Sequence, residues 1–281
     1  MPEKSARELW IRVLLFSLGA AGCVFVYLFL LNFQPVARAS PTAGVIPVLV
    51  LAVSSGWLTA RFLRADGLSQ AILGLTAPQR PFLYFGIGFI AGSALTGAWF
   101  VIVTLATNAT WHLNAKFATV SLLSASLFAL LNNVGEELIY RGYAFVRIAV
   151  HYGEFIPVVV TSTIFALLHF QAGLPLLSVH AGVFTAGLLF GATFARWRSL
   201  PLALGIHVAT NIVQEATGLR PSAASIFSPD YSTVSVAANS TILASIAALN
   251  LIVAAGILLI GRQRRQDIWR PNKSLERTRE G

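Results

Sequence analysis

The residues best suited to chemistry are two adjacent carboxylates and a guanidinium inside an apolar stretch that runs from about residue 122 to residue 150. They belong to Glu136, Glu137 and Arg141. An ionised side chain near the centre of a bilayer costs about 2.5–3.5 kcal/mol on insertion scales. Such groups are tolerated where they face a bundle interior or a water-filled cavity, so three together predict a functional site.

The spacing of the two glutamates predicts different roles for them. On a helix, Glu137 and Arg141 form an i,i+4 pair in the favourable order, with the acid nearer the N-terminus. Glu136 lies on another face with Asn132 and Asn133, which precede it by one turn. A carboxylate held in such a poorly solvated site can serve as a general base. The competing interpretation is an intramembrane ion pair that only fixes helix packing.

Two histidines lie in later apolar segments, each with a partner four residues away. Phe165 and His169 form one such pair, and His207 and Asn211 form the other. A single histidine in an apolar helix is more often a core residue than a catalyst, but two that follow the glutamates favour a shared site. A carboxylate base with imidazole and amide donors is what peptide hydrolysis needs when no serine or cysteine nucleophile is evident.

These residues make three motifs, E-E-x-x-x-R at Glu136, F-x-x-x-H at Phe165 and H-x-x-x-N at His207. In this order and on apolar helices, they resemble the type II CAAX prenyl endopeptidase and bacteriocin-processing (CPBP, or Abi) family of intramembrane proteases. The resemblance covers about residues 121–215, roughly a third of the chain. Eukaryotic relatives trim prenylated C-termini, so the resemblance implies a peptide or the C-terminal segment of a protein as substrate.

The resemblance also implies how the site works. It implies a glutamate-dependent peptidase that uses no metal and no cofactor. In that scheme Glu136, assisted by His169, activates a water, while His207 and Asn211 stabilise the oxyanion. Three further residues would support the site: Glu137, Arg141 and Phe165.

Three other functions compete with an intramembrane peptidase. Two histidines and a glutamate are a common zinc set, but the chain lacks H-E-x-x-H and Asn211 is a poor zinc ligand. A proton-coupled transporter also places charged residues at mid-membrane, but no internal repeat of the polar pattern is present. A catalytically silent scaffold or immunity protein of the same fold stays open.

The composition predicts a membrane protein. The chain is 56% hydrophobic and 11% charged, whereas soluble domains carry about 25% charged residues. Several apolar stretches exceed about 18 residues, which predicts an all-α, polytopic bundle of transmembrane helices. The single cysteine, Cys23, excludes an internal disulfide. The net charge of +9 comes from cations between apolar stretches and in the C-terminal tail, which indicates membrane lipids as partners rather than nucleic acid.

The apolar stretches predict about eight spans. Of the 20 Lys and Arg residues, 17 fall in the N-terminus, the even-numbered loops and the tail, so both termini are predicted to be cytoplasmic. We expect a bacterial cell (inner) membrane. The fourth helix must run, tilted, to about residue 150 if Glu136 is to reach mid-depth beside His169. The expected spans cover about residues 11–31, 44–63, 81–107, 118–150, 155–170, 176–197, 199–218 and 240–260.

The spans group into three parts of the chain. Residues 1–117 hold about three N-terminal spans, and residues 118–218 form the catalytic core. Residues 219–281 hold an external loop, the last span and a basic cytoplasmic tail. In the third and sixth spans, small residues at four-residue intervals predict close helix packing: Gly88, Gly92, Thr96, Gly187, Gly191 and Ala195.

Overall fold

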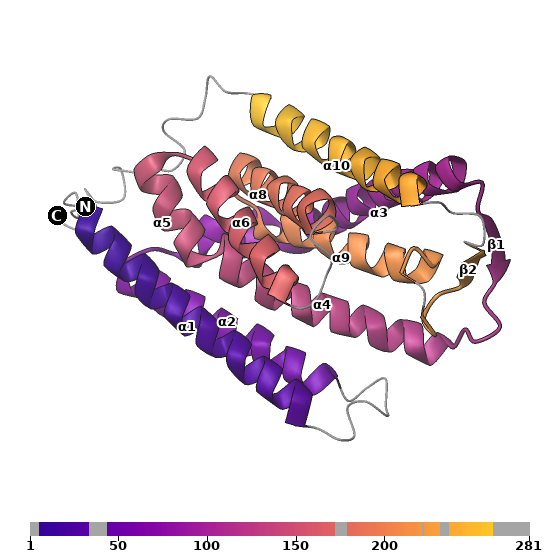
Figure 1. Cartoon of the computed structure of the whole chain (residues 1–281). Helices are drawn as coiled ribbons and strands as arrows, with labels where there is room; N and C mark the ends of the chain where they lie inside the picture. The colour runs from indigo at the N-terminus through magenta and orange to yellow at the C-terminus, as the bar shows by residue number, and fades with distance from the viewer. Residues whose placement is uncertain (1–5, 34–43, 172–178, 221, 231–235, 261–281) are drawn as a thin grey trace, which may run out of the picture.

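A computed structural model describes residues 6–33, 44–171, 179–220, 222–230 and 236–260. These residues form an elongated bundle of helices that run side by side (Figure 1). The described α-helices are α1 Ala6–Phe33, α2 Val45–Ala65, α3 Pro81–Thr107, α4 Thr119–Arg141, α5 Tyr143–Tyr152, α6 Phe155–Gln171, α8 Thr185–Trp197, α9 Leu200–Thr217 and α10 Val236–Leu259.

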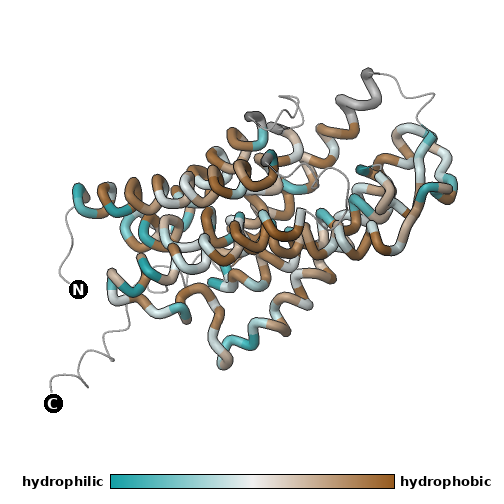
Figure 2. The backbone as a smooth tube through the Cα atoms, turned by 90° about the horizontal axis from the view of Figure 1, so that it is seen from below, coloured by the Kyte–Doolittle hydropathy of each residue, from teal (hydrophilic) through white to brown (hydrophobic). Residues whose placement is uncertain are grey.

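Five stretches of the described chain are long and apolar enough to cross a membrane: 6–32, 45–65, 81–107, 119–152 and 242–259. A shorter apolar helix covers residues 155–169. Hydrophobic residues predominate along the helices, and hydrophilic residues gather toward the ends of the bundle (Figure 2). These features confirm the predicted all-α, polytopic membrane bundle, but not the predicted number of eight spans.

The prediction for the fourth helix is wrong in one respect, because the helix is not continuous to residue 150. It breaks at Gly142, and α5 begins at the next residue. A Cβ atom at Gly142 would lie 2.0 Å from the carbonyl oxygen of Leu138 and 3.0 Å from the side chain of Thr59 on α2. The Thr59 hydroxyl donates a hydrogen bond to that same carbonyl, at 3.1 Å. The break is therefore fixed by contact with α2, which helical spacing in α4 alone does not reveal.

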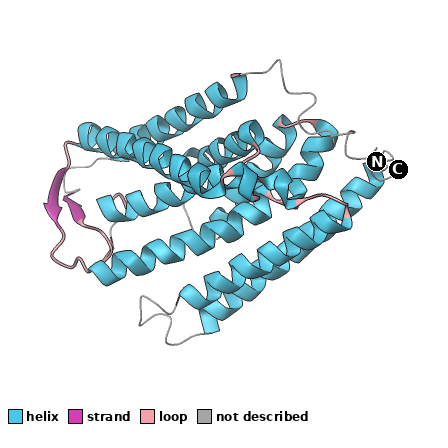
Figure 3. Cartoon of the chain, turned by 180° about the vertical axis from the view of Figure 1, so that it is seen from behind, coloured by secondary structure: helices cyan, strands magenta, loops and turns pink. Residues whose placement is uncertain are grey.

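A two-stranded sheet lies at one end of the bundle, where the sequence predicts only loops. Strand β1 Thr110–Leu113 pairs antiparallel with β2 Phe227–Asp230. The two strands project beyond the ends of the helices (Figure 3). The sheet ties the connection between α3 and α4 to the connection between α9 and α10.

The predicted boundaries of the seventh span are confirmed in α9. The Ser199 hydroxyl accepts a hydrogen bond from the Leu202 amide at 3.3 Å, which caps the helix start. The helix ends at Thr217, and the next residue, Gly218, has a φ of 80° that suits glycine. The predicted sixth span begins outside the described residues, and its described part consists of a π-helix, η3 Val179–Phe184, followed by α8.

The predicted small-residue stripes lie at close helix contacts. A Cβ at Gly88 of α3 would lie 2.2 Å from the Leu202 carbonyl oxygen of α9, and a Cβ at Gly92 would lie 2.6 Å from that of Ile206. In α8, a Cβ at Gly187 would lie 3.1 Å from Ser162 of α6. Glycine at these positions lets backbones approach as membrane helices often do. α3 therefore packs closely against α9, and α6 packs closely against α8.

A buried carboxylate joins α1, α2 and α5 at the end of the bundle opposite the sheet. Asp66 lies 2.6 Å from Arg12 and 3.0 Å from Arg147, and it accepts a hydrogen bond from Tyr143 at 2.7 Å. Its side chain is almost fully buried. A buried charge needs such partners to offset its desolvation. Sequence spacing gave no sign of this cluster, because its members lie on three separate helices.

Candidate active site

The predicted pair between Glu137 and Arg141 is confirmed by geometry. The two side chains lie 3.0 Å apart and both are completely buried. Arg141 also donates a hydrogen bond from Nη2 to the carbonyl oxygen of Gly187 at 2.9 Å. The guanidinium therefore connects α4 to α8 at a point where the small Gly187 brings α8 close to α6.

Aromatic rings surround the buried guanidinium. Its central carbon lies 5.4 Å from the ring centre of Phe165, 5.6 Å from that of Phe190 and 5.8 Å from that of Tyr140. A desolvated cation near aromatic faces gains cation–π stabilisation. Phe165 also packs edge-on against His169, with ring centres 4.5 Å apart. The phenylalanine of the F-x-x-x-H motif thus packs between the ion pair and the histidine four residues later.

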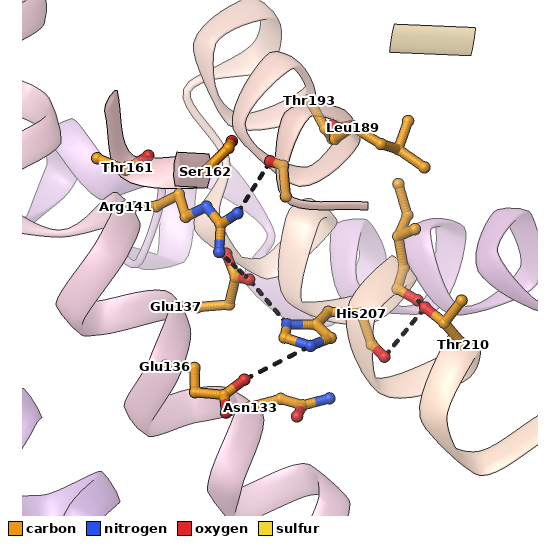
Figure 4. Close-up of polar contacts among 12 residues, drawn as sticks. Asn133, Glu136, Glu137, Arg141, Thr161, Ser162, Leu189, Thr193, His207 and Thr210 are labelled. Carbon is orange, nitrogen blue, oxygen red and sulfur yellow. Dashed lines mark hydrogen bonds and ion pairs between the residues drawn. The ribbon is translucent and has the colours of Figure 1, made fainter. Parts of the chain in front are cut away.

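His207 lies between the two glutamates (Figure 4). Its Nδ1 is 2.9 Å from Oε1 of Glu137, and its Nε2 is 3.6 Å from Oε2 of Glu136. The ring stacks on Phe190, with centres 4.3 Å apart. An ionised carboxylate only accepts hydrogen bonds, so Nδ1 carries the hydrogen that points to Glu137. Nε2 can therefore donate a hydrogen bond only when both ring nitrogens are protonated. The predicted role of His207 as an oxyanion donor is thus limited to the doubly protonated ring.

Glu136 differs from its neighbour in exposure and in partners. Its side chain is 18% exposed, whereas that of Glu137 is 0% exposed. Asn132 donates a hydrogen bond from Nδ2 to Oε1 of Glu136 at 2.8 Å. One carboxylate oxygen is thus held by the amide one turn earlier, and the other faces His207. This arrangement fits a carboxylate that can exchange a proton with a bound water.

Asn211 is held by a residue to which the sequence assigned no role. Its Nδ2 donates to Oδ1 of Asn133 at 3.1 Å, and the Asn133 side chain is completely buried. Both asparagines line the same cavity. The signal for Asn133 was its position three residues before Glu136 on the polar side of α4. Spacing within α4 could not show that its partner would be Asn211 of α9.

His169 lies near the end of α6 and is half-buried. Its Nδ1 is 2.9 Å from the carbonyl oxygen of Phe165. A carbonyl only accepts, so this contact places a hydrogen on Nδ1 and leaves Nε2 of the neutral ring as an acceptor. His169 makes no hydrogen bond to Glu136 among the described contacts. The two residues share a cavity and could be bridged by a water.

The cavity has a volume of about 820 Å³ and brings the four predicted catalytic residues together. Glu136, His169, His207 and Asn211 all line it, although they come from α4, α6 and α9. Phe165 lines it too, whereas Glu137 and Arg141 lie behind its wall. Among the described residues, no group of three or more His, Cys, Asp or Glu side chains is arranged to hold a metal ion.

Comparison with known proteins agrees with these motifs. Residues 117–213 match the model of the family described as type II CAAX prenyl endopeptidase Rce1-like. This segment contains all three motifs, so the match supports the resemblance that the sequence shows. No curated protein and no solved structure matches the chain.

Proposed function

We propose that this integral membrane protein, whose residues 117–213 match the Rce1-like model of type II CAAX prenyl endopeptidases, is an intramembrane endopeptidase that uses a glutamate-activated water. The observation that carries the proposal is the meeting of Glu136, His169, His207 and Asn211 around one cavity. The four residues supply a base, a water acceptor and amide and imidazole donors within hydrophobic helices. Peptide hydrolysis needs these groups when water itself is the nucleophile.

Glu136 is the proposed general base. Water bound between Glu136 and Nε2 of His169 transfers a proton to the Glu136 carboxylate while its oxygen adds to the peptide carbonyl carbon. Asn132 holds Oε1 of Glu136 at 2.8 Å, so the carboxylate is already oriented when the substrate binds. The same proton then moves from Glu136 to the leaving amine as the C–N bond breaks. No metal or cofactor takes part in this sequence.

Asn211 and His207 are the proposed donors to the oxyanion. Asn211 uses one N–H on Asn133, which leaves its second N–H for the developing negative charge. His207 can add a donor from Nε2 when its ring is doubly protonated. Donors that are already held in place lower the barrier because they need little reorganisation in a water-poor site. Glu137, Arg141 and Phe165 act behind these groups as positioning residues.

The test is turnover by the Glu136→Gln variant, measured on a library of membrane-inserted peptides with reporter groups at their C-termini. Glutamine keeps the shape but cannot accept the proton, so we expect a loss of about 10²–10⁴-fold, the usual contribution of a general base. Glu154→Gln, outside the cavity, is the matched control and should retain activity. Rates should be unchanged in a strong chelator.

Two results would contradict the proposal. Equal turnover by Glu136→Gln and the wild-type protein would remove the general base. Stoichiometric zinc that is lost on replacing His169 or His207 would favour a metallopeptidase. A folded wild-type protein that cleaves no member of the library would instead favour the catalytically silent scaffold.

A further inference from the structure

The cavity that contains the proposed catalytic residues is elongated along the axis of the bundle. On α4 its lining residues extend from Glu136 back to Ser121, which is about 22 Å along the helix at 1.5 Å per residue. On α9 the lining continues from His207 through Gln214 and then to Arg220, beyond the helix end. The start of α4, which holds Ser121, and the end of α9, which is followed by Arg220, lie at the end of the bundle that carries β1 and β2 (Figure 1). The cavity therefore runs from the catalytic set toward the sheet.

The opposite end of the cavity is occupied by protein. Beyond Glu136 come the fully buried side chains of Glu137 and Arg141, and then α5. Tyr143, Phe145 and Val146 of α5 are also completely buried. The described residues that line the cavity come from α3, α4, α6, η3, α8, α9, α10 and the residue Arg220, and none comes from α1, α2 or α5.

Positive charge is concentrated at the occupied end. The described arginines at that end stand at the start of α1, the end of α2, the start of α3, in α5 and at the end of α8: Arg7, Arg12, Arg61, Arg64, Arg80, Arg147, Arg196 and Arg198. At the sheet end, the described cations are Lys116 and Arg220. Loops rich in Lys and Arg stay on the cytoplasmic side of a membrane. The sheet end, toward which the cavity extends, is then the non-cytoplasmic side.

We infer that the cavity admits substrate from the non-cytoplasmic face, and that the substrate is a membrane-anchored peptide segment presented on that face. The nature of the substrate rests on the proposed peptidase function, whereas the side of entry does not. The mouth is polar, with Gln214, Glu215 and Arg220, and the wall contains apolar Leu243 and Ile246 of α10. A depth of about 22 Å holds about six or seven residues of extended chain. The substrate thus combines polar groups at the mouth with apolar side chains against the wall.

Cysteine labelling from each side of the membrane tests the direction of entry without requiring catalysis. The only native cysteine is first removed with Cys23→Ala. Single cysteines are then introduced in the cavity as Ser126→Cys and Gln214→Cys, and at the exposed, arginine-rich end as Gln70→Cys. A membrane-impermeant thiol reagent is applied to spheroplasts of a bacterial host and, separately, to inverted membrane vesicles.

We expect the two cavity cysteines to react in spheroplasts and the Gln70→Cys protein to react only in inverted vesicles. Failure of both cavity cysteines to react in spheroplasts, or their reaction from the same side as Gln70→Cys, overturns the inference. Because labelling does not depend on turnover, an inactive Glu136 site would leave this result standing. Conversely, active protein with cavity cysteines reached only from the vesicle side would support the peptidase and reject the entry route.

Discussion

The adjacent residues Glu136 and Glu137 have different neighbours because the helix turns their side chains in different directions. Glu136 reaches the cavity, where water and a substrate can meet it. Glu137 is sealed between Arg141 and His207, so it cannot meet a substrate directly. Its carboxylate instead fixes the tautomer of His207 and the position of the guanidinium. Loss of either glutamate should therefore impair the proposed peptidase for a different physical reason.

The first prediction distinguishes the roles of the two glutamates by the stability of their variants. Glu137→Gln leaves Arg141 buried without its ion-pair partner, and removing one partner of a buried pair typically costs about 3–5 kcal/mol. We expect a clearly lower unfolding temperature in detergent for Glu137→Gln, and little change for Glu136→Gln. The double variant Glu137→Gln with Arg141→Met should recover part of the loss, because it leaves no buried charge unpaired. Equal unfolding temperatures for Glu137→Gln and the wild type would contradict the structural role.

The second prediction concerns the hydrogen bond between Asn211 and Asn133. Asn211→Ala should lower kcat by about 10²–10³-fold, the usual cost of one oxyanion donor, with little change in KM. Asn133→Ala should lower kcat less, because it removes only the acceptor that orients Asn211. The double variant should be no slower than Asn211→Ala, since contacting residues are coupled. Multiplicative loss in the double variant, or an effect mainly on KM, would rule out this coupled donor arrangement.

At the scale of helices, glycine decides how closely α3 and α9 approach. A Cβ on Gly88 would lie 2.2 Å from the Leu202 carbonyl oxygen, and a Cβ on Gly205 would lie 2.2 Å from that of Phe85. Neither backbone atom can rotate away, so the helices must separate. His207 is only two residues after Gly205, which means that a shift of α9 would also move the imidazole that faces both glutamates.

The third prediction uses two glycines of the same helix. Gly88→Ala should destabilise the protein by about 1–3 kcal/mol, the usual cost of overpacking. Gly86→Ala is the matched control, since a Cβ there meets no described atom within 4 Å, and alanine is a better helix former by about 1 kcal/mol. Thermal unfolding in detergent measures both. A Gly88→Ala protein as stable as the Gly86→Ala protein would show that α3 and α9 are not in tight contact.

The sequence predicts those features whose residues lie close together in the chain. The i,i+4 pairs, the Ser199 cap and the glycine stripes each lie within one helix, and each has the predicted neighbour or position. The break at Gly142 depends on Thr59 of α2, and the β1–β2 pairing joins segments more than a hundred residues apart. Contacts of this kind leave no periodic pattern. The Asp66 cluster and the bond between Asn133 and Asn211 were missed for the same reason.

At the scale of the whole molecule, the separation of arginines from the cavity mouth predicts orientation. Reporter fusions after residues 70, 112 and 230 should place the first in the cytoplasm and the other two outside it, because arginine-rich loops are retained on the cytoplasmic side. Enzymatic activity of paired reporters, one active on each side, measures this. A cytoplasmic signal at residue 112 or 230 would reject the predicted topology with both termini in the cytoplasm.

The residues that line the cavity come both from the segment that matches the family model and from parts of the chain outside it. The predicted catalytic residues lie in the segment 117–213 that matches the family model, but Trp99 of α3 and Leu243 and Ile246 of α10 lie outside it. The three motifs and part of the cavity wall are therefore encoded in separate stretches of the chain. Inherited change in α3 or α10 can alter which segment fits while the motifs stay as they are. Related chains could in this way share the three motifs and differ in what the cavity accepts.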